Sequence, residues 1–120
     1  DPRVSCQQHR RIVMLTGDTM KRSPHSYSGL NEVSVANLES GERQFYRYAD
    51  SQIPEEHLFV AKSGSRAETD GWLLGTVHDW VKQATLLNVF DINSVDAGPI
   101  AQAALPYALP LGLHGKFVEG

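Results

Sequence analysis

The chain has 120 residues, 41% of them hydrophobic, with 11 basic and 14 acidic side chains and a formal net charge of -3. This length suits one domain with a modest core, and the charge supplies no basic surface of the kind that binds nucleic acid. The single cysteine, Cys6, excludes an internal disulfide and a thiolate metal cluster, and it fits a reducing compartment such as the cytoplasm. The longest strongly apolar stretch, 100–113, is interrupted by prolines and polar residues, so no transmembrane segment is predicted.

Apolar residues alternate with polar ones along most of the chain, a spacing typical of β-strands. The alternation predicts short strands at residues 11–16, 30–38, 43–48, 58–62, 71–78, 85–92, 100–105 and 115–118. Glycine, aspartate and serine clusters separate these strands, so successive strands are expected to pair as antiparallel hairpins. Residues 79–84 are long enough for only a single helical turn.

A weak internal repeat indicates how the strands are grouped. Residues 33–38, followed by Gly41, resemble residues 87–92, followed by Gly98. The blades of a β-propeller are about 40 to 50 residues long and contain four strands each, so the chain would supply roughly two blades. Two blades cannot close a ring and would leave strand edges open. Because the sequence also begins without a methionine or a signal-peptide pattern, we expect an excerpt of a larger protein.

His114 is the best candidate for a functional residue. It lies between Gly112 and Gly115, after Pro110, and small neighbours let an ion approach an imidazole closely. Neutral imidazole is the commonest metal ligand, but one imidazole cannot hold a metal, so further ligands would have to come from elsewhere. On spacing alone, a histidine satisfied by backbone at a strand start is the simpler interpretation.

The remaining histidines lack this setting and are interpreted as surface or strand residues; they are His9, His25, His57 and His78. His78 and Asp79 are not expected to belong to a nucleophilic triad, because no Gly-x-Ser-x-Gly elbow is present. The adjacent Glu55 and Glu56 would ordinarily be a solvated pair of carboxylates.

Five segments in a fixed order cover nearly the whole chain: Asp-Pro-Arg at 1–3 with His-Arg-Arg at 9–11, Asn-Leu-Glu-Ser-Gly-Glu at 37–42, Glu-His-Leu-Phe-Val at 56–60, Glu-Thr-Asp-Gly-Trp-Leu-Leu at 68–74, and Pro-Leu-Gly-Leu-His-Gly-Lys-Phe at 110–117. In this order they resemble the C-terminal quarter of the carotenoid oxygenase family, which includes carotenoid-cleaving and stilbene-cleaving dioxygenases. The chain departs from that family's pattern at three positions. His57 replaces a proline, Leu113 replaces an aromatic residue, and Phe117 stands where tryptophan is common.

The resemblance implies an all-β fold in which residues 1–120 form the C-terminal portion of a single seven-bladed propeller domain, without a separate domain boundary. It implies a non-haem iron, Fe(2+), held on the propeller axis by four histidines, of which only His114 would lie in this chain. It also implies that Glu56 hydrogen-bonds a ligand imidazole, with His114 as one candidate, and such a partner fixes the tautomer and orientation of the ring. No catalytic residue is expected beyond the metal centre.

The implied reaction is oxidative cleavage of a conjugated C=C bond by dioxygen, in a carotenoid, an apocarotenoid or a stilbene, to give two carbonyl products. The implied partners are the missing N-terminal part of the same chain, dioxygen and the apolar substrate; the 120 residues alone are expected to be inactive. Residues 103–113 would line a substrate entrance, make a peripheral membrane contact, or simply form a buried strand and its turn. The alternative function is a non-catalytic β-propeller-like interaction module in which His114 is an ordinary strand residue.

Overall fold

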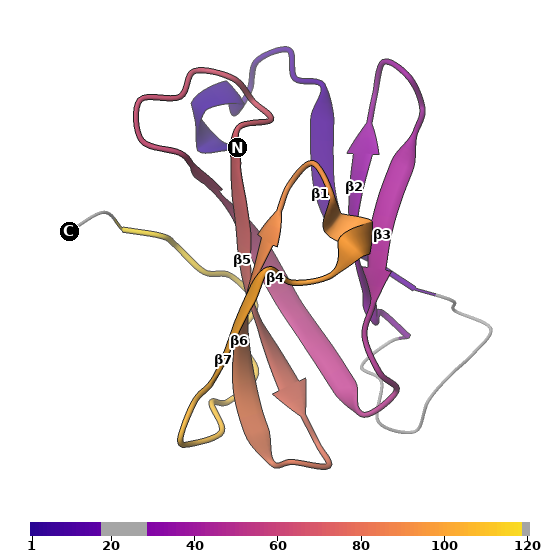
Figure 1. Cartoon of the computed structure of the whole chain (residues 1–120), viewed down its shortest axis with the longest axis vertical. Helices are drawn as coiled ribbons and strands as arrows, with labels where there is room; N and C mark the ends of the chain where they lie inside the picture. Colours follow the sequence, from indigo (N-terminus) through magenta and orange to yellow (C-terminus); the bar gives the residue numbers. More distant parts are fainter. Residues whose placement is uncertain (18–28, 119–120) are drawn as a thin grey trace.

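The structure is a computed structural model that describes residues 1–17 and 29–118, and it consists of two antiparallel sheets (Figure 1). The first sheet has the order β1-β2-β3 and the second the order β4-β5-β6-β7. Two short 3-10 helices, η1 (Pro2–Val4) and η2 (Val95–Ala97), accompany the strands. The strands are β1 (Arg11–Thr16), β2 (Glu32–Asn37), β3 (Arg43–Arg47), β4 (Gln52–Ala61), β5 (Gly71–Asp79), β6 (Ala84–Asp91) and β7 (Ala101–Ala104).

Every strand pairs with the next one along the chain except β3 and β4, which belong to different sheets. The expected hairpins are therefore confirmed within each sheet, and the all-β prediction is confirmed. The single helical turn considered for 79–84 is not formed, because residues 80–83 make the turn that joins β5 to β6. The predicted strand at 115–118 is also wrong, because these residues are exposed and pair with no strand. Within residues 1–17 and 29–118, no helix is long and apolar enough to cross a membrane.

One apolar core joins the two sheets. Its buried members come from β2, β5 and β6, from the segment after β3 and from the turn that contains η2, and they are Val33, Val35, Tyr48, Leu73, Val77, Leu86, Phe90, Ile92 and Val95. Phe90 is fully buried and its ring contacts Tyr46, Tyr48 and His57 at centroid distances of 5.4, 6.4 and 5.7 Å. Burial of large side chains of this kind contributes about 1.5 to 3 kcal/mol each, so this core is what keeps the sheets together.

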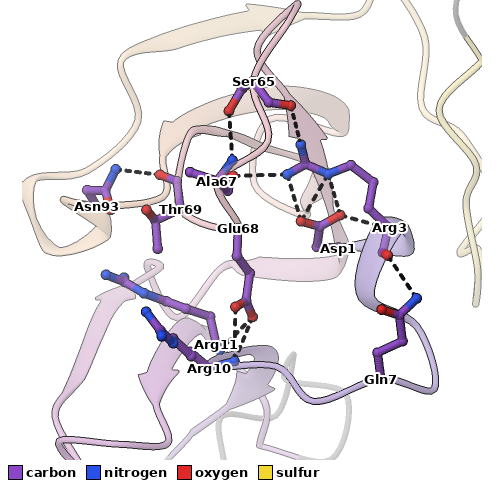
Figure 2. A network of polar contacts seen from close by, with 10 residues as sticks. All are labelled: Asp1, Arg3, Gln7, Arg10, Arg11, Ser65, Ala67, Glu68, Thr69 and Asn93. Atoms are coloured by element: carbon purple, nitrogen blue, oxygen red, sulfur yellow. Dashed lines mark hydrogen bonds and ion pairs between the residues drawn. The ribbon is translucent and has the colours of Figure 1, made fainter.

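The N-terminal segment is fastened to the loop between β4 and β5 by the polar network in Figure 2. The guanidinium of Arg3 donates to the carbonyl oxygens of Ser65 and Ala67 at 2.7 and 3.0 Å. The Glu68 carboxylate accepts hydrogen bonds from backbone N–H groups at the start of β1 and just before it. The start of the first sheet is thereby anchored to the second sheet, which brings β1 beside β4.

Candidate metal-ligand site at the end of the chain

A β-bulge in β4 creates the site. Pro54 pairs with Val77 and His57 pairs with Gly75, so Glu55 and Glu56 together lie opposite the single residue that remains on β5. Proline has no N–H to give to the sheet and is found in strands mainly at edges and bulges. A regular strand directs successive side chains to opposite faces, whereas a bulge alters that alternation. Both carboxylates here reach the C-terminal segment, which is yellow in Figure 1.

Glu56 and His114, singled out from the sequence, are brought together. Oε2 of Glu56 lies 3.5 Å from Nδ1 of His114 and accepts a hydrogen bond from the backbone N–H of Gly115 at 2.9 Å. The Glu56 side chain is 40% exposed and the His114 side chain 87% exposed. Among the described residues, Nε2 of His114 has no hydrogen-bond partner. The arrangement therefore presents one imidazole nitrogen to a carboxylate and leaves the other available.

Glu55 is the functional candidate that sequence reasoning missed. Its side chain is only 10% exposed, so the interpretation of a solvated pair is wrong for this carboxylate. One oxygen accepts from the hydroxyl of Thr76, and the other accepts from the backbone N–H of Gly112. Nε2 of His78 lies 3.5 Å from the second oxygen. The signal that could have revealed Glu55 is Pro54, because a proline inside an alternating strand indicates a bulge and two neighbouring side chains of altered direction.

His57 supports the bulge from inside the sheet. Its Nδ1 lies 2.8 Å from the carbonyl oxygen of Glu55, so Nδ1 carries the proton and donates. Nε2 therefore accepts from the hydroxyl of Tyr48 at 2.8 Å. Burial lowers the pKa of His57 to about 4, although the hydrogen bond to Glu55 acts in the opposite direction, and burial raises the pKa of Tyr48. The ring fits only because Gly75 is opposite, where a Cβ atom would lie 2.5 Å from it.

The other histidines do not join this site as a metal cluster. His78 is buried on β5 and His9 is exposed, whereas His25 lies outside the described residues. Across residues 1–17 and 29–118, no three His, Cys, Asp or Glu side chains are grouped so that they could hold a metal ion. A metal at His114 would thus need further ligands from outside those residues. A neutral imidazole with a carboxylate at one nitrogen is a suitable single donor for a transition-metal ion in such a shared site.

The His114 side chain is largely exposed, and it borders a pocket that has apolar residues on one side. A cavity of about 280 Å³ lies between β1 and the C-terminal segment. Val13, Met14 and Leu15 of β1 form one wall, and the rest of the lining comes from Glu56, His57, Leu113 and His114. An apolar wall beside an imidazole lowers the local dielectric constant on that side of the ring.

Comparisons with known proteins agree with this architecture. An isoeugenol monooxygenase of Pseudomonas nitroreducens is 27% identical over 98% of this chain and 26% of its own length. An apocarotenoid-15,15'-oxygenase of Synechocystis is 30% identical over 75% of this chain and 18% of its own length. The structure of cobalt-substituted Synechocystis apocarotenoid oxygenase superposes with a TM-score of 0.82 at 25% identity, covering 95% of this chain and 23% of that one.

The chain thus spans about a quarter or less of the length of these relatives. Its two sheets match part of the propeller fold of the apocarotenoid oxygenase, which confirms the predicted fold class. The family model described as "RPE65: Retinal pigment epithelial membrane protein" matches residues 1–119. The chain belongs to this family of oxygenases, the carotenoid oxygenase family that its motifs resemble.

Proposed function

We propose that this chain is the C-terminal portion of a single-domain, non-haem iron(II) dioxygenase that cleaves a conjugated C=C bond to two carbonyl products. His114 is one of four histidine ligands of the iron, and Glu56 is the carboxylate that orients its ring. The other ligands come from the part of the longer protein that precedes these residues. The 120 residues alone bind iron weakly and do not turn over substrate. The protein works in the cytoplasm, with the apolar residues of 103–113 available for peripheral contact with a membrane.

The observation that carries this proposal is the pairing of Glu56 with His114. The two residues are 58 positions apart in the sequence, and the bulge in β4 places the carboxylate 3.5 Å from Nδ1 of the imidazole. A histidine that binds a metal through one ring nitrogen usually donates the N–H of its other ring nitrogen to a carboxylate or a carbonyl. This hydrogen bond raises the basicity of the nitrogen that binds the metal. Supporting evidence for the reaction comes from the relatives, whose names describe oxygenases that act on isoeugenol and on apocarotenoids. Both substrates contain a conjugated C=C bond.

Each residue of the site has a defined task in this proposal. Glu56 keeps the proton of His114 on Nδ1, so that the lone pair of Nε2 is free to bind metal. The bound iron would supply the activation of dioxygen. The apolar wall formed by Val13, Met14 and Leu15 of β1 offers a surface against which a hydrocarbon substrate packs beside the metal. Four neutral imidazoles leave the charge of iron(II) uncompensated, which differs from sites that contain a ligating carboxylate.

The test is metal analysis of the complete protein and of its His114→Ala variant. We expect the variant to lose iron and activity toward stilbene and apocarotenoid substrates, because one of the ligands is removed. His9→Ala is the matched control, since His9 is an exposed histidine outside the site, and it should keep both. Unchanged iron content in His114→Ala would refute the proposal and favour the non-catalytic interaction module.

A further inference from the structure

We infer that Glu55 is a second positioning residue for His114: Glu55 and Glu56 together fix the backbone on both sides of the imidazole. The inference rests on the proposed role of His114 as a metal ligand, and it assigns a task to a carboxylate outside the family motif. Glu55 accepts from the N–H of Gly112, and Glu56 accepts from the N–H of Gly115. His114 lies between these two points of attachment.

Two attachments matter because the segment that carries His114 is not part of either β-sheet. Residues 110–118 belong to no strand and are exposed along their whole length. A segment attached at one point still rotates about that point, whereas attachment on both sides of a residue fixes its Cα–Cβ direction. Hydrogen bonds from backbone N–H groups to carboxylates are also stronger than those to neutral acceptors. The pair of carboxylates therefore replaces the strand pairing that would otherwise order this part of the chain.

Glu55 is itself held in place from β5. The hydroxyl of Thr76 donates to one of its oxygens, and Thr76 is the residue that faces the bulge. The imidazole of His78 lies beside the other oxygen at 3.5 Å. Since the Glu55 side chain is 10% exposed, these contacts leave it little freedom to choose another rotamer. Because Glu55 is held by β5 and itself holds the N–H of Gly112, it fixes where the segment that carries His114 lies relative to β5.

The bulge makes this arrangement possible. In a regular strand Glu55 and Glu56 would face opposite sides of the sheet, and only one could reach the C-terminal segment. The hydrogen bond from Nδ1 of His57 to the carbonyl oxygen of Glu55 holds the bulged backbone, and it comes from the residue that replaces the family's proline. His57 thus stabilises the bulge that allows Glu55 to reach the C-terminal segment.

The experiment measures Co(II) binding by the complete apo-protein, through the ligand-field absorption of the bound ion. Glu55→Ala should weaken Co(II) binding by about 10- to 100-fold, the usual effect of losing a residue that orients a ligand. It should also change the positions and intensities of the absorption bands, because the imidazole no longer approaches the ion in one direction. Glu55→Gln keeps an oxygen acceptor for Gly112 and should stay within about threefold of the wild-type affinity. Glu42→Gln, an exposed carboxylate in the β2–β3 turn, is the control and should bind as wild type.

The outcomes separate this inference from the proposed function. If His114→Ala abolishes the bands while Glu55→Ala leaves affinity and spectrum unchanged, the positioning role of Glu55 is wrong and the ligand role of His114 survives. If His114→Ala leaves the bands unchanged, the proposed function itself fails. Should circular dichroism show that Glu55→Ala does not fold, Thr76→Val decides instead. That variant removes only the hydroxyl that orients Glu55, so altered bands support the inference and wild-type bands overturn it.

Discussion

Acidification should destabilise this protein through His57. The imidazole is neutral in the folded state, where burial lowers its pKa from 6.5 to about 4. Above pH 6.5 neither the folded nor the unfolded state binds this proton, so stability is complete there. Between pH 6.5 and pH 4 the unfolded chain takes up the proton first, and stability falls. A pKa difference of this size corresponds to about 3 kcal/mol, with a slope that approaches about 1.4 kcal/mol per pH unit.

The assay is urea unfolding of the wild type and of His57→Phe at pH 7, 6, 5 and 4. Phenylalanine retains a ring of similar size over Gly75 but has no titrating group. At pH 7 the variant should be less stable by about 1 to 3 kcal/mol, because the hydroxyl of Tyr48 and the carbonyl of Glu55 lose their partner. Toward pH 4 the difference should close or reverse, since only the wild type must release a proton from this imidazole in order to fold.

His9→Ala serves as the control for the loss of any histidine, and its stability should follow that of the wild type within about 0.5 kcal/mol at each pH. Groups that titrate in both proteins cancel in the comparison, so the change in the difference isolates His57. If the wild type and His57→Phe lose stability in parallel from pH 7 to pH 4, His57 is not the cause of the acid destabilisation.

Two further substitutions test the packing and the charges around the site. Gly75→Ala should cost about 1 to 3 kcal/mol, because its Cβ atom would lie 2.5 Å from the His57 ring; a loss below about 0.5 kcal/mol in thermal unfolding would contradict this. Glu32→Gln should cost about 1 to 3 kcal/mol at pH 7, since the buried carboxylate accepts from Arg43 at 2.6 Å and from Arg47 at 2.5 Å. Although burial acts in the opposite direction, hydrogen bonds from Arg47, Thr16 and Arg43 lower the pKa of Glu32, so its contribution is present above pH 4.5 and is lost as pH falls through the lowered value. The difference between wild type and Glu32→Gln should therefore shrink below pH 4.5, and a constant difference would show that the charge is not involved.

Much of the fold was predictable because alternation is strong where one face of a strand is buried. Residues 11–16 were predicted as a strand with the bounds of β1; β5 extends one residue beyond its predicted range, and β6 is shifted by one residue at both ends. Prediction failed at β4, which begins at Gln52 rather than at residue 58. Pro54 and two adjacent carboxylates look like an interruption in the sequence, and only the pairing with β5 reveals a bulge.

For the candidate site, the sequence predicted which two residues lie together, and their roles stay predictions. Motif resemblance identified Glu56 and His114, and the structure places them in contact. The role of Glu55 depends on which face of the sheet its side chain occupies in the bulge. The hydrophobic periodicity of the sequence does not indicate this. The strand predicted at 115–118 is wrong for a related reason. An alternating apolar pattern becomes a strand only when the backbone of a neighbouring strand supplies its hydrogen bonds. His57 was interpreted as a surface or strand histidine, and its burial over Gly75 follows from a cross-strand pair of residues far apart in the sequence.

The contacts of Arg3 also determine when the N-terminal segment can dock during synthesis. Its two carbonyl acceptors are 62 and 64 residues further along the chain. A ribosome that adds about 5 to 20 residues per second supplies them roughly 3 to 12 s after Arg3 itself. Hairpins form in microseconds, so β1, β2 and β3 have ample time to associate first. The N-terminal segment therefore docks only after β1, β2 and β3 can pair, once the loop that follows β4 has been synthesised.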